Sequence, residues 1–324
     1  MPLLEVDMLT TSFASPSGPL RAVDRLSFSV EAGQTVAIVG ESGSGKSVTA
    51  MSIMRLLGPR VQHQGQVRFE GQDLLAIGEA RMRAVRGNRI GMIFQEPMSA
   101  LNPVKTVGDQ IAEGLRLHRG LRGKAALDLT VEQLRQVGIS APERRVREYP
   151  HQLSGGMRQR VMIAMALVCD PALLIADEPT TALDVTVQAQ ILDVIREQTR
   201  RLGSGVILIT HDLGVVAELA DRVVVVYAGR KVEEGDVRQV LTSPRHPYTR
   251  GLLAATPRLS GGAGHHGGPM TEIPGNVPPI GWRSEGCDFA PRCASVMDCC
   301  HHRRPVLTGF GEGRTAACLK LENA

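Results

Sequence analysis

The order of apolar and polar residues along the chain predicts an α/β protein. Apolar residues alternate with polar ones near the start, which is typical of half-buried strands. Two continuous apolar runs, at 172–176 and 206–209, predict buried parallel strands separated by a helix over about 185–202. An amphipathic helical pattern covers 127–137, and residues 223–233 predict a late hairpin.

Composition fits a soluble intracellular protein with an ample core. The 324 residues allow one large domain and something smaller, and 43% hydrophobic content is normal. The first residues carry acids where a signal peptide needs bases, and the longest apolar run, 161–169, is too short to cross a bilayer. The net charge of +4 and 3% aromatic content give little support to a nucleic-acid partner.

A shift in composition divides the chain. Residues 256–281 are rich in Gly and Pro with few apolar residues, which predicts a linker. Five of the six cysteines follow residue 280. We therefore expect one domain over 1–255, and a linker with a small cysteine-rich extension over 256–324.

A phosphate-binding pattern, G-x-x-x-x-G-K-S/T, occupies residues 40–47, between a strand-like run and a helix-like run from Val48 through Leu57. Its residues are Gly40, Glu41, Ser42, Gly43, Ser44, Gly45, Lys46 and Ser47. Glycines let the backbone curl around a phosphate, and the following helix N-terminus adds positive potential. Lys46 would reach the β- and γ-phosphates, and the Ser47 hydroxyl would bind Mg²⁺. The setting disfavours the alternative of a Gly-rich turn that binds nothing.

The apolar run at 172–176 ends in two carboxylates, Asp177 and Glu178. A parallel strand delivers such residues to the carboxyl edge of its sheet, where α/β folds bind ligands. Asp177 is suited to hold Mg²⁺ through water, and Glu178 could polarise the attacking water. A solvated acidic strand end is the plain alternative, which the nearby phosphate-binding pattern makes less attractive.

Residues 151–160, His-Gln-Leu-Ser-Gly-Gly-Met-Arg-Gln-Arg, are similar to the signature motif of ATP-binding cassette (ABC) ATPases. Physically the motif is a small-residue loop that opens a helix, hence a second anion-binding helix N-terminus, although a simple Gly-containing cap would look alike. The resemblance implies a P-loop NTPase ABC cassette with a RecA-like parallel-sheet core, an antiparallel β subdomain and a helical signature subdomain.

The resemblance also implies that two cassettes pack head to tail. Ser154, Gly155 and Gly156 of one would then meet the γ-phosphate held by Lys46 of the other. The other family positions are Phe13 (adenine stacking), Gln95 (sensing Mg²⁺ and the γ-phosphate), Ala182-Leu183-Asp184 (the interface loop) and His211 (the switch histidine). The plain alternatives are a core aromatic, a surface glutamine and a structural histidine. In the implied mechanism, Glu178 activates water while His211 orients it with the γ-phosphate.

Residues 95–103, 107–111 and 246–253 resemble the ATPase subunits of bacterial dipeptide, oligopeptide and related nickel importers. The resemblance implies a peripheral subunit at the cytoplasmic face of the inner membrane that binds ATP and Mg²⁺. Its partners would be two transmembrane permease subunits, a second ATPase (a paralogue or the same chain) and, indirectly, an external solute-binding protein. Nickel or other small-solute import and export stay open. DNA-repair and translation ATPases are disfavoured, since the former insert a long coiled coil and the latter carry two cassettes.

The late cysteines resemble the C-terminal extension of these importer ATPases, in which four cysteines can carry a four-iron, four-sulfur (4Fe–4S) cluster. The candidate ligands are Cys287, Cys293, Cys300 and Cys318, with Cys300 favoured over Cys299 by the family pattern. Thiolates suit the cluster, and a cytosolic chain argues against disulfides. Zinc, held with His301 or His302, and free thiols stay open because spacing alone does not fix the metal.

Overall fold

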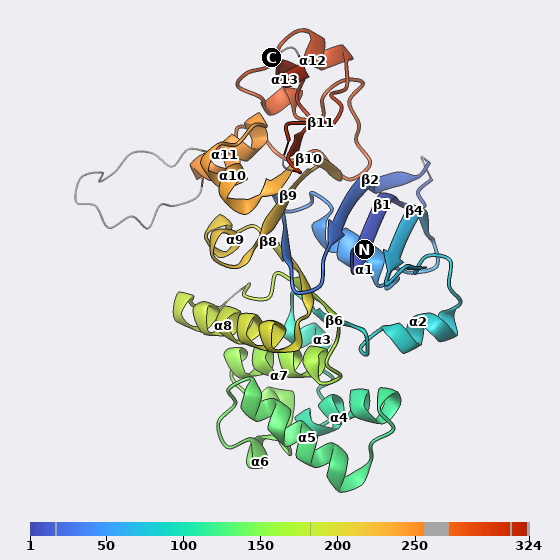
Figure 1. The fold of residues 1–324 in the computed structure, drawn as a ribbon, viewed down its shortest axis with the longest axis vertical. Coiled ribbons are helices and arrows are strands. Elements are labelled where there is room, and N and C mark those ends of the chain that lie inside the picture. The colour runs from blue at the N-terminus through green and yellow to red at the C-terminus, as the bar shows by residue number, and fades with distance from the viewer. Residues whose placement is uncertain (17, 182, 256–271, 312, 323–324) are drawn as a thin grey trace, which may run out of the picture. The chain divides into compact units, whose positions relative to one another are not determined.

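The computed structural model describes residues 1–16, 18–181, 183–255, 272–311 and 313–322 (Figure 1). The chain divides into two compact units, each described by itself below. Unit 1 comprises Met1–Leu4, Ser29–Thr35 and Arg68–Ile209, and unit 2 comprises Glu5–Phe28, Val36–Val67 and Thr210–Ala324. Most of the predicted linker, residues 256–271, and Ala182 of the predicted interface loop lie outside the described residues.

Unit 1 is built on parallel strands with fully buried side chains. They are β6 (Ile90–Ile93), β7 (Leu173–Asp177) and β8 (Gly205–Thr210). Strand β7 pairs with both of the others, Ile93 lying opposite Ala176 and Ile175 opposite Ile207. Burial on both faces explains why β7 and β8 are continuous apolar runs rather than alternating ones. The two predicted parallel strands are confirmed.

The remaining part of unit 1 is mainly helical. Its helices are α2 (Glu79–Val85), α3 (Pro97–Ala100), α4 (Val107–His118), α5 (Gly123–Gln136), α6 (Pro142–Arg145), α7 (Gly155–Leu167) and α8 (Val185–Leu202), with a 3-10 turn, η1, at Pro150–Gln152. The predicted helix at 185–202 is therefore confirmed. Helix α7 packs so closely on β6 that a Cβ at Gly91 would lie 2.3 Å from the Ala166 carbonyl oxygen.

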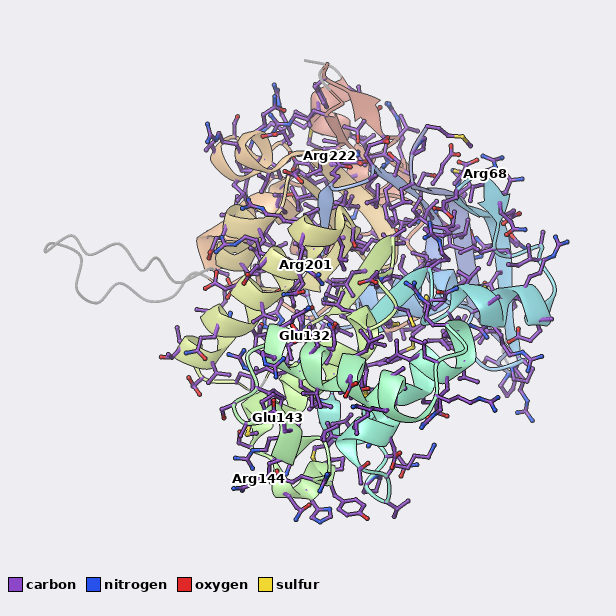
Figure 2. The ribbon with its side chains drawn as sticks, turned by 60° about the horizontal axis from the view of Figure 1, so that its bottom comes forward. Arg68, Glu132, Glu143, Arg144, Arg201 and Arg222 are labelled. Atoms are coloured by element: carbon purple, nitrogen blue, oxygen red, sulfur yellow. The ribbon has the colours of Figure 1, made fainter. Side chains whose placement is uncertain are left out.

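Local sequence fixes several helix ends in unit 1. The Thr106 side chain caps α4 by accepting a hydrogen bond from the Asp109 amide, and Gly203, with φ 64°, ends α8. The solvent side of this region carries charged residues. Glu132 of α5 and Glu143 of α6 are labelled in Figure 2. Both form ion pairs with Arg135 of α5.

Two sets of strands make up unit 2. The first contains β1 (Leu4–Phe13), β2 (Leu20–Val30) and β4 (Val61–Phe69), in the order β2-β1-β4, and the last residues of β4 pair antiparallel with β5 (Gln72–Asp73). The second contains β3 (Thr35–Val39), β9 (Arg222–Tyr227), β10 (Arg230–Asp236), β12 (Thr315–Ala316) and β11 (Thr308–Gly309), in that spatial order. Strands β3 and β9 are parallel, whereas β9 and β10 form the predicted antiparallel hairpin.

The helices of unit 2 are short. They are α1 (Lys46–Ile53), α9 (Leu213–Leu219), α10 (Val237–Thr242), α11 (Pro247–Ala255), α12 (Cys299–His302) and α13 (Leu319–Glu322), with a 3-10 turn, η2, at Ala290–Arg292. The prediction of a helix through Leu57 was wrong, because Arg55 adopts a left-handed conformation (φ 49°) that ends it. In the described ranges, no helix is both long and apolar enough to cross a bilayer.

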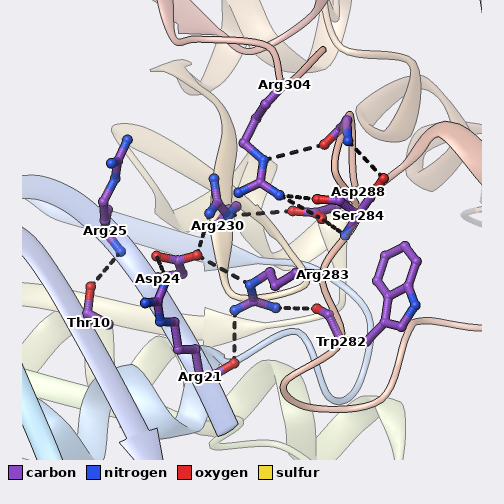
Figure 3. A network of polar contacts seen from close by, with 11 residues as sticks. Thr10, Arg21, Asp24, Arg25, Arg230, Trp282, Arg283, Ser284, Asp288 and Arg304 are labelled. Atoms are coloured by element: carbon purple, nitrogen blue, oxygen red, sulfur yellow. Dashed lines mark hydrogen bonds and ion pairs between the residues drawn. The ribbon is translucent and has the colours of Figure 1, made fainter. Parts of the chain in front are cut away.

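The cysteine-rich extension packs into the core of unit 2. Phe289 is 4% exposed and lies edge-on to Tyr227 and tilted to Tyr248, with ring centroids 5.2 and 5.3 Å away. An ion-pair network adds to this contact (Figure 3). The buried Asp24 carboxylate of β2 accepts hydrogen bonds from Arg230 and from Arg283 of the extension. The extension therefore shares a hydrophobic core and buried charges with the strands of unit 2.

Candidate active site

The phosphate-binding pattern of unit 2 forms a strand-loop-helix turn between β3 and α1. Gly40 and Gly45 have φ angles of 156° and 100°, and a Cβ would lie 2.2 Å from the Val226 carbonyl oxygen at Gly40 and 2.6 Å from the Ala22 carbonyl oxygen at Gly45. Only glycine fits both the backbone and the space at Gly45. Gly43 also has a positive φ, 79°, and with Ser42 it is exposed, whereas Val48 in α1 is half-buried.

The polar groups of the loop are arranged around the start of α1. Lys46 is 4% exposed, and its ammonium donates to the carbonyl oxygens of Gly40 (2.7 Å) and Glu41 (3.0 Å). The buried Ser44 hydroxyl has no hydrogen-bond partner among the described residues. No side chain caps the N-terminus of α1, which begins at Lys46 with the Ser47 hydroxyl in its first turn. A buried lysine, an unpaired hydroxyl and a helix N-terminus together suit a phosphate.

The acidic strand end of unit 1 gathers three predicted residues. Asp177 is the last residue of β7 and is 2% exposed. The next residue, Glu178, has a left-handed backbone (φ 46°), and its carboxylate oxygen Oε2 accepts hydrogen bonds from Gln95 Nε2 (3.1 Å) and Thr181 Oγ1 (2.9 Å). Gln95 follows β6, which is parallel to β7, so both side chains lie at the same carboxyl edge. A non-glycine residue in this conformation stores strain, as often found in functional sites.

The signature residues of unit 1 lie at the start of α7. Ser154 caps the helix, its hydroxyl accepting from the Met157 amide at 3.4 Å, and Ser154 and Gly155 are exposed. A Cβ at Gly156 would come within 3.0 Å of the Val187 side chain on α8, so small size matters there. Asp184 is exposed and caps α8 by accepting from the Val187 amide at 2.9 Å.

The other two predicted nucleotide residues belong to unit 2. Phe13 is half-buried at the end of β1, and His211 is exposed directly after β8. Asp212 next to it caps α9, its carboxylate accepting from the Gly214 amide at 2.8 Å. The structure thus brings Gln95 together with Glu178, and it places residues 40–48 in the phosphate loop and the start of α1. These two groups of residues belong to different units.

The four candidate cysteine ligands line one small cavity in the extension. Apolar neighbours Ala290, Met297 and Leu319 share the wall, and His246 reaches it as well. Cys300 is buried, whereas Cys299 is exposed and does not line the cavity. Burial raises the pKa of Cys287 to about 11 and also raises the pKa of Cys293. Among the described residues, no three His, Cys, Asp or Glu side chains are positioned to hold a metal ion.

Sequence reasoning missed the partner of Glu41 in the phosphate loop. The Glu41 carboxylate forms a bidentate ion pair with Arg292, which lies 251 positions further along the chain. Opposite charges at that separation leave no signal in a single sequence. The Glu41 amide also donates to the Tyr248 hydroxyl at 2.8 Å.

Solved structures identify the class to which this fold and these motifs belong. A dimeric post-hydrolysis structure of the ATP-binding cassette MJ0796, bound to ADP and Pi, matches with a TM-score of 0.65 and 27% identity, covering 72% of this chain and 99% of that one. Clostridium perfringens cbiO1, part of the ABC transporter complex cbiONQ, matches with a TM-score of 0.62 and 27% identity, over 75% of this chain and 91% of that one. The chain is an ATPase of the ABC cassette class, as its phosphate loop, acidic strand end and signature helix indicate.

Sequence relatives narrow the class to a family. The ABC transporter model matches residues 23–181, and the model named oligopeptide/dipeptide transporter, C-terminal region, matches residues 232–300. A putative peptide import ATP-binding protein of Brucella ovis is 51% identical over 99% of this chain and 98% of its own length. The oligopeptide transport ATP-binding protein OppD of Mycobacterium tuberculosis is 51% identical over 99% of this chain and 52% of its own length. The chain belongs to the ATP-binding subunits of the dipeptide and oligopeptide ABC transporter family.

Proposed function

We propose that this chain hydrolyses ATP to power the import of dipeptides or oligopeptides across a membrane. The match of residues 232–300 to the oligopeptide/dipeptide transporter C-terminal region carries the proposal, because it separates this cassette from ABC ATPases in general. Full-length relatives named for peptide import agree with it. The nucleotide-binding domain is assigned to 1–255, and the linker with the cysteine-rich extension to 256–324.

Residues of unit 2 hold the phosphates in this proposal. The Lys46 ammonium exchanges its bonds to the Gly40 and Glu41 carbonyls for the β- and γ-phosphate oxygens, and the unpaired Ser44 hydroxyl gains an acceptor. Loop amides at the start of α1 add further donors. Phe13 stacks on the adenine, and His211 orients the γ-phosphate and the attacking water.

Residues of unit 1 supply the proton chemistry. The Glu178 carboxylate takes a proton from water as the water attacks, while the hydrogen bonds from Gln95 and Thr181 keep that carboxylate in one orientation. The Ser47 hydroxyl, the Gln95 amide oxygen and the Asp177 carboxylate are hard oxygen donors of the type that Mg²⁺ prefers. When bound, Mg²⁺ supplies charge neutralisation for the transferring phosphoryl group.

A second cassette and a permease complete the proposed assembly. Ser154, Gly155 and Asp184 are exposed, so a second ATPase, whether a paralogue or another copy of this chain, has access to them. Two transmembrane permease subunits would bind the segment after Gln95, where Met98 and Val104 are 63% and 80% exposed. The chain would then be peripheral on the cytoplasmic face of the inner membrane, with an external solute-binding protein as an indirect partner.

We also propose that the cysteine cavity holds a 4Fe–4S cluster through Cys287, Cys293, Cys300 and Cys318. The four thiols line one cavity with apolar walls, and thiolates are the donor type that iron–sulfur clusters require. The described structure does not position three of these side chains around a metal ion, so cluster binding requires the thiols to move closer together. Since burial raises the pKa of Cys287, metal binding there must release thiol protons. When bound, the cluster would cross-link distant segments of the extension through its four thiolate ligands, and a four-coordinate zinc ion would do the same.

Transport by the assembled complex tests the proposed function. The chain is co-purified with its permease and partner ATPase, placed in vesicles with the external binding protein, and supplied with ATP and either labelled oligopeptide or nickel. We expect ATP-dependent accumulation of peptide. Accumulation of nickel alone, or release of preloaded solute in the opposite direction, would contradict it. ATP hydrolysis without any transport by the complete assembly would also refute the importer assignment.

A further inference from the structure

Glu41, the second residue of the phosphate loop, is held by residues from the far end of the chain. Its carboxylate accepts two parallel hydrogen bonds from Arg292, Nη1 to Oε2 at 2.8 Å and Nη2 to Oε1 at 2.9 Å. Its amide donates to the Tyr248 hydroxyl at 2.8 Å, and its carbonyl oxygen accepts from the Lys46 ammonium at 3.0 Å. One residue therefore connects the phosphate-binding lysine with the C-terminal part of unit 2.

Arg292 is itself rigidly placed within the cysteine-rich extension. Its side chain is 5% exposed, its Nε donates to the Pro274 carbonyl oxygen at 2.8 Å, and its guanidinium lies 5.8 Å from the centroid of the Tyr227 ring. Arg292 ends the turn η2 and immediately precedes Cys293, whose thiol lines the cysteine cavity. Because the guanidinium is planar and is held by several contacts, its two hydrogen bonds to the Glu41 carboxylate also fix the position of that carboxylate.

The charge of Glu41 makes this contact functionally significant. A carboxylate in a loop that must receive polyphosphate opposes binding, since like charges repel. Arg292 neutralises that carboxylate and directs it into the extension. Removing Arg292 would leave an uncompensated, partly buried negative charge in the loop and would free the backbone around the Glu41 carbonyl that contacts Lys46.

We propose that Arg292 is a positioning residue for the phosphate loop, so that the affinity for ATP depends on the folded cysteine-rich extension through the Arg292–Glu41 ion pair. The proposal rests on ATP binding at residues 40–47. It assigns the extension a role in nucleotide binding, whichever metal its cysteines hold.

Equilibrium ATP binding to the full-length chain tests the proposal. We expect Arg292→Met to raise the Kd for ATP by roughly tenfold, which corresponds to about 1.4 kcal/mol. Arg283→Met is the matched control, because Arg283 also belongs to the extension and pairs with a carboxylate, Asp24, at 3.3 Å, but makes its other polar contacts with Arg21 and Trp282. The Kd of the Arg283→Met chain for ATP should stay within about twofold of the Kd of the unmodified chain. An Arg292→Met chain with unchanged affinity would overturn the proposal.

A double variant tests whether the effect runs through Glu41. Glu41→Gln alone already lacks the full ion pair, so adding Arg292→Met to it should weaken ATP binding much less than Arg292→Met does in the unmodified chain. The same fold-weakening by Arg292→Met with and without Glu41→Gln would show that Arg292 acts by another route and would also overturn the proposal.

Arg292→Lys keeps the positive charge and serves if the methionine variant does not fold. A lysine cannot form the bidentate contact, so we expect faster hydrogen–deuterium exchange at the amides of residues 40–47, with unchanged exchange in α8. Unaltered exchange in the loop would count against positioning. If the unmodified chain binds no ATP, the proposed function fails; if it binds ATP while Arg292→Met binds equally well, only this inference fails.

Discussion

Replacing Glu178 by glutamine is expected to stop turnover while leaving ATP binding intact. The carboxylate accepts hydrogen bonds from Gln95 at 3.1 Å and Thr181 at 2.9 Å, and a glutamine of the same size retains an oxygen that can accept. The left-handed backbone, φ 46°, strains either residue alike, so that cost cancels. What Glu178→Gln removes is basicity. General-base catalysis contributes about 10²- to 10⁴-fold, or about 2.7 to 5.4 kcal/mol of activation free energy.

Two measurements separate this role from a structural one. Steady-state phosphate release by the chain with its partner subunits should fall by that factor, while the Kd for ATP stays within about threefold. Asp193→Asn is the matched control, because Asp193 is an exposed carboxylate on α8 that pairs only with its neighbour on the helix, Arg196, among the described residues. Near-normal hydrolysis by Glu178→Gln would refute the assignment. A parallel loss of ATP binding would show that Glu178 holds the site together instead.

Three further changes probe the loop, the charge network and the cysteines. Gly45→Ala should weaken ATP binding by tenfold or more in an equilibrium assay, because Gly45 has a φ of 100° and an added Cβ would lie 2.6 Å from the Ala22 carbonyl oxygen. Gly58→Ala is the control: a Cβ there meets open space, so this variant should bind ATP normally. Burial favours the neutral form of Asp24, but the arginines around it, Arg230 foremost, outweigh this and hold the pKa of its carboxyl below the ordinary value of an aspartate. Asp24→Asn should therefore lower the free energy of unfolding, measured in urea, by about 3 kcal/mol at pH 7. The difference from the unmodified chain should shrink as the pH falls through the lowered pKa of Asp24. A difference that does not depend on pH would show that the ion pairs of Asp24 are not its cause. After anaerobic purification, the Cys300→Ser chain should contain no iron or acid-labile sulfide, whereas the Cys299→Ser chain should contain both. If the unmodified protein contains no iron, the cluster is ruled out.

Sequence patterns predicted those parts of the fold whose secondary structure is determined by nearby residues. Strand β7 and helix α8 appear where continuous burial and helical periodicity placed them, and Asp184 and Gly203 mark both ends of that helix. The phosphate loop was predictable because its glycines are required by backbone geometry. The end of α1 was not predictable, since the residues around Arg55 give no indication that Arg55 adopts a left-handed conformation. The family pattern favoured Cys300 over Cys299, and Cys300 is the buried one, but the adjacent identical residues alone would not show which of them is buried.

The least predictable contacts are those that the extension makes with the rest of unit 2. Its arginines pair with carboxylates outside the extension: Arg283 with Asp24, which Arg230 also contacts, Arg292 with the partly exposed Glu41, and Arg314 with the buried Glu233. The Glu233 side chain is 0% exposed, so loss of Arg314 would leave a buried negative charge without its ion-pair partner, at a cost of several kcal/mol. Phe289 closes the aromatic core over Tyr227. Because the cysteine-rich extension forms ion pairs at three separate places in unit 2, it is structurally part of the unit that contains the phosphate loop. Changes in the cysteine cavity that displace Arg292 should therefore alter the affinity for ATP.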